Sequence, residues 1–458
     1  MKKRQLIMAQ LGVLLLIVAI IWIKITTHFD ATGSPDILVN VNEYGAIGDG
    51  VHDNTKAFQT AIDDVFQQGG GTVFVPAGMY NLNPIYLKKN VHLLGEQRDT
   101  VILKLADDAP DDYTRIITTA DDTSIQSITC DGNYQNHPNG IEHMHCIFID
   151  DNENVSIKNN KIINAVGDGI SVTGSSKTSK NITIENNIVK ENQRSQIVIE
   201  QVNHLQVTNN VIESKTGRPA LHFEPWEEQQ YEDATISMNK IESNVNGNCV
   251  LLAGADSEQA EKDEPGYFFN HIKFYQNEVH CPKGALLLMD TSNANVFDNQ
   301  LTVKEIHVWR KNQQVRIEGN HINANIGIRI EGGKDGKLIS TGTVIIGNAI
   351  NTENDGVNIH AGGNETYISN NHFTGSNKAS GVALFASDDI TNTVITDNTF
   401  LHYQTGVFLD YDYYAATKIE RVRITSNLFF ISKNKAVVQT NHNRRLIKEL
   451  VISNNQYY

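Results

Sequence analysis

The chain has 458 residues, with 38 basic against 53 acidic side chains and a formal net charge of −15. This balance argues against a nucleic acid partner, and against long-range attraction for a polyanionic glycan unless a bound cation bridges the two. The length would allow several domains, but repeated units that stack on one another need no second core.

Residues 1–25 predict a membrane segment. An apolar run from Leu6 to Ile23, broken only by Gln10, follows the basic start of the chain. As a helix it would reach about 27 Å, enough to cross a bilayer core with its basic flank inside. Because no small-residue cleavage site follows the run, we expect a single-pass anchor; if the segment is cleaved, the protein is secreted. Residues 26–36 then form a linker, and residues 37–458 form one domain outside the cell.

The first part of this domain predicts a capping helix. Asp53 or Thr55 can begin it, and its apolar face consists of Ala57, Phe58, Ala61, Ile62, Val65 and Phe66. We expect this helix to cover the first repeat, since an open strand edge and an uncovered core invite aggregation.

The stretch from Val41 to Lys104 carries a family resemblance. It includes Gly69-Gly-Gly-Thr-Val-Phe-Val-Pro and Val91-His-Leu-Leu-Gly-Glu, and it resembles the opening of the rhamnogalacturonase/epimerase-like pectate lyase superfamily. The resemblance implies a right-handed parallel β-helix that acts on a polysaccharide at its outer face. It does not imply the reaction, because neither the Gly-His-Gly motif of polygalacturonase-type hydrolases nor the Asp-Pro-His motif of mannuronan epimerases is present.

Short alternating strands recur through the rest of the chain, and each ends at an asparagine. The steps between these asparagines are 21 to 38 residues, which is the period of a solenoid. With two or three strands per coil, the pattern predicts an all-β stack capped by the N-terminal helix; a propeller or a leucine-rich repeat is excluded by the lack of either consensus. We expect the asparagine to tolerate the left-handed bend and to hydrogen-bond its equivalent one coil away. The series is Asn160, Asn187, Asn210, Asn239, Asn277, Asn299, Asn320, Asn348, Asn371, Asn398, Asn427 and Asn455.

Four cysteines are too few for a disulfide scaffold. Cys130 could bridge to Cys146, or Cys249 to Cys281, since each pair lies about one coil apart; the alternative is four buried thiols. No Cys-x-x-Cys is present, so no metal site is predicted.

Neighbouring coils place residues of equal register in a column about 4.8 Å apart. One outward column contains Asp150, Glu200 and Glu224, and the column beside it contains Ser171 and His222. These predict catalytic residues Glu200, Glu224, Asp150 and His222. Glu224 is the expected general acid, because apolar neighbours would hold its proton, and Glu200, about 5 to 7 Å away, or Asp150 is the base or nucleophile. The alternative is a solvated outer face without catalytic function.

Predicted substrate ligands surround this pair of columns. Arg194 and Arg218 each precede a glutamate by six residues, and Trp226 and Tyr231 lie in a loop where they can stack on sugar rings. Ser171 is the fifth predicted substrate ligand. A second polar cluster of Arg329, Glu331, Asn358 and His360 is a candidate distal sugar subsite.

Three functions follow from these residues. The first is an enzyme that hydrolyses glycosidic bonds of an extracellular polysaccharide with paired carboxylates and no cofactor. The second is a polysaccharide lyase or epimerase, in which Arg194 or Arg218, with Ca²⁺, neutralises a uronate. The third is a non-catalytic, membrane-tethered glycan-binding protein. The sequence leaves the glycan and the oligomeric state open.

Overall fold

The structure is a computed structural model that describes residues 37–225, 231–254, 269–332, 339–411, 418–439 and 447–458. The chain divides into two units, Met1–Leu38 and Val39–Tyr458, and the second is described here. Among the described residues no helix is long and apolar enough to span a bilayer. The predicted anchor, the linker and Trp226 lie outside the described residues.

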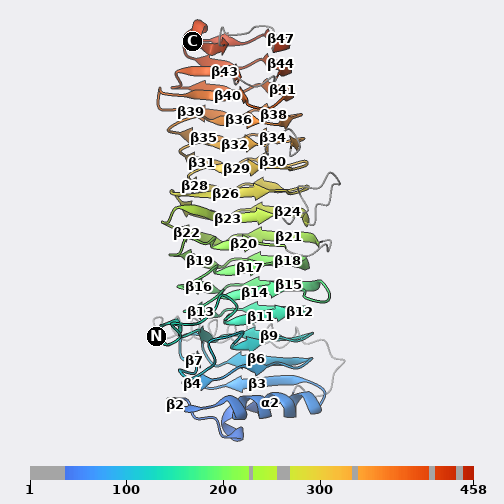
Figure 1. Cartoon of the computed structure of the whole chain (residues 1–458), viewed down its shortest axis with the longest axis vertical. Helices are drawn as coiled ribbons and strands as arrows, with labels where there is room; N and C mark the ends of the chain where they lie inside the picture. The colour runs from blue at the N-terminus through green and yellow to red at the C-terminus, as the bar shows by residue number, and fades with distance from the viewer. Residues whose placement is uncertain (1–36, 226–230, 255–268, 333–338, 412–417, 440–446) are drawn as a thin grey trace, which may run out of the picture. The chain divides into compact units, whose positions relative to one another are not determined.

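The second unit is a stack of coils built from three parallel sheets. One coil consists of β12 (Glu153–Lys158), β13 (Lys161–Ile163) and β14 (Ile170–Thr173), and each strand pairs in parallel with its counterpart one coil on. We name the sheets A, B and C after these three strands. Figure 1 shows the coils one above another, from β3 (Gly71–Val75) near the blue end to β47 (Ile447–Ser453) at the red end. The predicted parallel β-helix is confirmed.

Sheet C positions the candidate site. Its strands, in order along the stack, are β5 (Ile85–Tyr86), β8 (Ile117–Thr118), β11 (Ile147–Asp150), β14, β17 (Ile197–Ile199), β20 (Leu221–Phe223), β23 (Gly247–Ala253), β26 (Gly284–Met289), β29 (Ile306–Trp309), β32 (Ile328–Glu331), β36 (Val357–Ala361), β40 (Ser380–Ala386), β43 (Thr405–Tyr411) and β46 (Val437–Gln439). Alternate side chains of each strand enter the core, so the intervening ones face outward.

The asparagine ladder forms as predicted. The Asn160 backbone N–H donates to Asn187 Oδ1 at 2.9 Å, while Asn160 Nδ2 donates to Ile125 O at 2.9 Å, and this pattern continues to Asn455. The predicted left-handed conformation falls one residue earlier, at Asn159 (φ 55°) and its equivalents. The residue that bends the chain and the ladder asparagine are therefore different residues. The ladder asparagine is buried, and its amide pairs with backbone groups of neighbouring coils.

The capping helix is α2 (Thr55–Gln67), which contacts β3 and β5 at the blue end of the stack (Figure 1). Its N-cap is Asn54 rather than Asp53 or Thr55, and Asp53 instead accepts a hydrogen bond from the Thr55 N–H. Five of the six predicted apolar positions are buried. The sixth, Phe66, was predicted wrongly: it is 46% exposed, since it lies at the edge of the face that covers the coil.

The cysteines resolve into one bridge and two thiols. Cys249 in β23 forms a disulfide with Cys281 at the end of β25 (Glu278–Cys281). Cys130 and Cys146 are free and buried in the core. Of the two possible pairings only the second forms, and the alternative of four buried thiols is wrong for Cys249 and Cys281.

Candidate active site

The outward column predicted on sheet C exists. The registers pair Phe148 with Ser171, Ser171 with Val198, and Val198 with His222. These side chains have little accessible surface, however, since Ser171 is 2% and His222 is 5% exposed. The alternative of a solvated face does not hold for Ser171, Val198 and His222, and a substrate must be met by other side chains.

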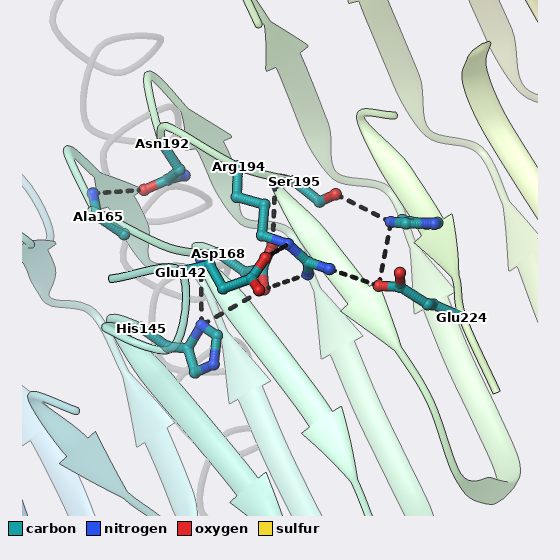
Figure 2. Close-up of polar contacts among 9 residues, drawn as sticks. Glu142, His145, Ala165, Asp168, Asn192, Arg194, Ser195 and Glu224 are labelled. Atoms are coloured by element: carbon teal, nitrogen blue, oxygen red, sulfur yellow. Dashed lines mark hydrogen bonds and ion pairs between the residues drawn. The ribbon is translucent and has the colours of Figure 1, made fainter. Parts of the chain in front are cut away.

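Asp168 is the buried centre of a polar network (Figure 2). Its side chain has no exposed surface, and Oδ1 accepts a hydrogen bond from the Ser195 N–H at 2.8 Å. Oδ2 accepts from Arg194 Nη1 at 2.9 Å and lies 3.4 Å from His145 Nδ1. The Asp168 N–H donates to the same His145 nitrogen at 3.1 Å, which leaves the imidazole proton on Nε2.

The Gly167-Asp168-Gly169 sequence explains how a carboxylate is accommodated there. A Cβ on Gly167 would lie 2.1 Å from the Glu142 carbonyl oxygen, and one on Gly169 would lie 2.5 Å from Asn192 Nδ2. Both positions that flank Asp168 therefore require glycine, because a side chain there would prevent the close approach of the neighbouring chain. The pair of glycines therefore lets the corner before β14 pack tightly and holds Asp168 inside it.

Arg194 connects Asp168 to the surface. Its Nη2 donates to Glu224 Oε2 at 2.6 Å, and its Nε lies 3.1 Å from Glu142 Oε2. The Glu224 side chain, directly after β20, is 39% exposed, whereas that of Arg194 is 15% exposed. In Figure 2 the guanidinium lies between the carboxylates of Asp168 and Glu224. Glu224 is thus the group that both belongs to the network and can meet a substrate.

His222 and Ser195 do not form a catalytic triad with Glu224. Ser195 Oγ lies 3.2 Å and Glu224 Oε2 lies 3.6 Å from the same ring nitrogen, His222 Nδ1. A triad needs the serine and the acid on opposite ring nitrogens. Ser195 also has no exposed surface, so acyl transfer through it is excluded.

Burial sets the protonation of the inner groups. It raises the pKa of the Asp168 carboxyl to about 7, although Arg194 and the Ser195 N–H favour the carboxylate. Burial lowers the pKa of His222 to about 4 against the opposing effect of Glu224, and it lowers the pKa of His145 as well. Both histidines are therefore neutral near pH 7. The carboxyl whose pKa burial raises is Asp168, which the sequence did not predict as a site residue.

The other two predicted carboxylates have different surroundings. Asp150 is in register with Thr173, as predicted, but its oxygens accept hydrogen bonds from the Ser175 N–H at 2.8 Å and Ser175 Oγ at 3.1 Å. These bonds hold the turn after β14. Glu200 follows β17, is half-buried, and hydrogen-bonds through its backbone N–H to Val172.

Arg218 is the remaining cation near the site. It is exposed, lies in the turn before β20, and its charge contributes to lowering the pKa of His222. Within the ranges that the structure describes, no carboxylate pairs with it. Tyr231, predicted to lie in a loop, is instead the first residue of β21 (Tyr231–Ser237). The described part of the chain holds no group of three or more His, Cys, Asp and Glu side chains arranged to bind a metal ion.

Sequence reasoning missed Asp168, Ser195, His145 and Glu142 as parts of the site. One signal was available: Asp168 and Ser195 each lie two residues before a sheet C strand, so they occupy the same corner in adjacent coils. Corner residues of adjacent coils also lie one above another, but alternation predicts the register of strand residues only.

Residues 38–246 match the family model described as rhamnogalacturonase A/epimerase, pectate lyase-like. The network around Asp168 lies within this range. Mannuronan C5-epimerase AlgE2 of Azotobacter vinelandii is 39% identical over 110 residues, which is 21% of this chain and 11% of that protein. Alginate lyase 7 of the same organism is 33% identical over 123 residues, which is 24% of this chain and 14% of that protein. This chain therefore matches only a small part of these relatives.

A solved structure extends the comparison to the fold. The A-module of mannuronan C-5 epimerase AlgE6 from Azotobacter vinelandii superimposes with a TM-score of 0.56 and 18% identity, covering 86% of this chain and all of that one. At this identity the similarity supports the fold alone.

Proposed function

We propose that the protein removes the C5 proton of uronic acid units in a polysaccharide outside the cell. The starting point is the match of residues 38–246 to a pectate lyase-like family model, which the stretch from Val41 to Lys104 predicts. The relatives named above are two enzymes of that chemistry by their printed names, a C5-epimerase and an alginate lyase. Their similarity covers a minority of this chain, so the proposal depends mainly on the site.

The contact between Arg194 and Glu224 carries the proposal. A guanidinium 2.6 Å from a carboxylate stabilises the ionised form, which accepts protons, and disfavours the protonated form, which donates them. Glu224 is 39% exposed and so can reach a sugar. The geometry therefore favours Glu224 as a base rather than the general acid expected from its apolar sequence neighbours.

Arg218 supplies the second requirement. Removal of a proton next to a carboxylate needs a positive charge that stabilises the developing enolate. Arg194 is occupied by Asp168, Glu142 and Glu224, whereas Arg218 is exposed at the level of β20 and close enough to influence His222. Arg218 is thus the better candidate for binding the substrate carboxylate.

The reaction then has two outcomes from one intermediate. Glu224 takes the C5 proton, and the electron pair moves into the substrate carboxylate beside Arg218. Return of a proton from water to the opposite face of C5 gives the epimer. If the electron pair instead forms a C4–C5 double bond, the oxygen at C4 leaves, takes a proton from water, and the chain is cleaved.

Hydrolysis has weaker support. It needs a carboxylic acid within reach of the glycosidic oxygen. Asp168 is the site carboxyl whose pKa is raised to about 7, and it has no exposed surface. It therefore acts through Arg194 and not on a sugar.

Incubation in D₂O tests the proposal. Polymannuronate, polygalacturonate and a neutral glucan are each treated with the protein, and the products are followed by proton NMR, ultraviolet absorbance and reducing-end assay. An epimerase exchanges deuterium into C5 without shortening the chain, and a lyase gives an unsaturated product that absorbs in the ultraviolet.

Other outcomes overturn the proposal. New reducing ends without absorbance or exchange identify a hydrolase. Binding without any modification identifies a glycan-binding protein. Arg218→Ala should raise the KM for a uronate substrate, while Lys240→Ala, which removes a cation from sheet B, should not.

A further inference from the structure

A second polar cluster lies on sheet C outside residues 38–246. The Glu331 carboxylate is 2.8 Å from Arg329 Nη2, 3.3 Å from His307 Nε2 and 3.7 Å from His360 Nδ1. These side chains come from β29, β32 and β36, so three coils converge on one carboxylate. The charge of Glu331 is balanced by Arg329, and His360 Nδ1 also lies 3.3 Å from Ser387 Oγ.

A β-bulge sets the position of His360. Ile330 pairs with Ile359 but Glu331 pairs with Ala361, so His360 is the extra residue in β36. Bulges redirect side chains and occur beside functional sites. Here the bulge stacks the imidazole on the Phe385 ring, with centroids 5.3 Å apart and 20° between the planes. The two rings form a flat aromatic surface at the side of the cluster.

A pocket of about 410 Å³ opens beside these rings. One part of its wall is apolar, from Ala383, Phe385 and Phe408, and the other is polar, from Asp355, Asn358 and Ser380. Asn358 Nδ2 donates to Asp355 Oδ2 at 2.7 Å, but Asn358 Oδ1 is buried without a hydrogen-bond partner. A buried acceptor in this state needs a donor, which a bound ligand can supply.

The chemistry of this wall identifies the ligand class. A flat aromatic surface suits the apolar face of a pyranose ring, and an unpaired amide oxygen suits a hydroxyl donor. Among the described residues that line the pocket, the only side chain able to carry positive charge is His360, and Asp355 is acidic. Recognition through ring and hydroxyls is therefore favoured over recognition of an anionic group.

The pocket is on the same face as Glu224. The register runs from His222 through Leu251, Leu287, His307 and Arg329 to Asn358, which is five coil steps. At about 4.8 Å for each step the separation is roughly 24 Å. Leu251 and Leu287, which follow His222 on this path, are apolar, as suits the faces of successive sugar rings.

We infer that the pocket beside His360 and Phe385 is a distal sugar-binding site, which holds one pyranose unit of a glycan chain whose other end lies at Glu224. The identity of that glycan rests on the proposed function, but the site itself does not. Its consequence is that chains longer than about 24 Å bind more tightly than shorter ones.

Calorimetric titration with oligosaccharides tests this site. Protein carrying Glu224→Gln, which slows turnover, is titrated with oligomannuronates, oligogalacturonates and neutral oligoglucosides shorter and longer than the span. We expect the long oligomers to bind roughly tenfold more tightly, and Phe385→Ala or Asn358→Ala to abolish this advantage without changing the affinity for short oligomers. The matched control is Phe297→Ala, which removes a half-buried ring stacked on Tyr275 on sheet A.

The outcomes separate this inference from the proposed function. Equal affinity for short and long oligomers, an unchanged advantage in the Phe385→Ala protein, or no binding at any length overturns the distal site. A length advantage that Phe385→Ala removes, in a protein that modifies no glycan in D₂O, supports the distal site and rejects the proposed reaction. Thermal unfolding of each variant shows whether it has folded.

Discussion

Arg194 Nη2 lies 2.6 Å from Glu224 Oε2, so an arginine before β17 holds the carboxylate that follows β20 in the next coil. The same guanidinium donates to Asp168, which precedes β14 one coil in the other direction. An exposed carboxylate is therefore connected to a fully buried one through a single side chain. Under the proposed function, this relationship gives the inner groups a positioning role and leaves Glu224 to contact the substrate.

Replacement of Glu224 by glutamine should lower turnover by at least ~10², because the amide cannot accept the proton, while the fold stays intact. The free energy of unfolding should change little, since the position is exposed at the surface of the stack. Steady-state kinetics and thermal unfolding measure the two effects. Glu278→Gln, an exposed glutamate on sheet B, is the matched control. Full activity in the Glu224→Gln protein would direct attention to Glu331 and His360.

Asp168 should make the free energy of unfolding fall as pH rises. Its pKa is 3.8 in the unfolded chain and about 7 in the folded one, so between these values the folded state binds more protons. Its contribution is complete below pH 3.8 and is lost as pH rises through about 7. The difference in unfolding free energy between the native protein and Asp168→Asn should therefore decrease by about 4 kcal/mol across this window.

Urea denaturation of both proteins at several pH values measures that difference. His222, whose pKa is lowered to about 4, acts in the opposite direction, since its contribution is lost as pH falls through that value. It is present in both proteins and cancels. A difference that does not vary with pH would show that Arg194 keeps Asp168 ionised throughout.

Loss of one ladder asparagine should lower the free energy of unfolding by about 2 to 4 kcal/mol. In Asn239→Ala, the Asn210 N–H, the Val207 carbonyl and Asn277 Oδ1 all lose a partner in the core. The midpoint of chemical denaturation should fall accordingly. Asn323→Ala removes an exposed amide that pairs with Asn351 on the surface, and its midpoint should remain near that of the native protein.

Phe58 and Phe66 of α2, one buried and one exposed, provide a matched test of the cap. Phe58→Asp should cost several kcal/mol, because Phe58 has no exposed surface and the carboxylate would be buried against the first coil. Phe66→Asp on the same helix should cost far less, since Phe66 is 46% exposed. Thermal unfolding of the two variants compares them directly. Equal losses would mean that helix propensity, and not core coverage, determines the result.

The apolar run from Leu6 to Ile23 should keep the protein with the membrane fraction. Cell fractionation and N-terminal sequencing of the recovered protein check this expectation. A soluble form that begins near Thr32 would show that the segment is cleaved. Deletion of residues 1–25 should release the protein while the strand signal of its circular dichroism spectrum remains.

Sequence alone determined the stack of coils. Strand alternation and the asparagine that closes each repeat are local features of the sequence, so a repeat with both can be recognised from its period before any contact is known. The buried face of α2 followed from helical periodicity for the same reason, apart from Phe66 at its edge. The outward column from Phe148 to His222 was also predictable, because strand register fixes it.

Tertiary structure alone decided the site. Asp168 and Arg194 lie at corners between strands, where no alternation sets the direction of a side chain, and their contact depends on how tightly Gly167 lets the chain approach. The bulge at His360 and the choice of Cys249 and Cys281 for the disulfide likewise depend on how adjacent coils align. Repeating hydrophobic patterns specify the stack, but distances between corners of different coils arise only once the coils are packed together.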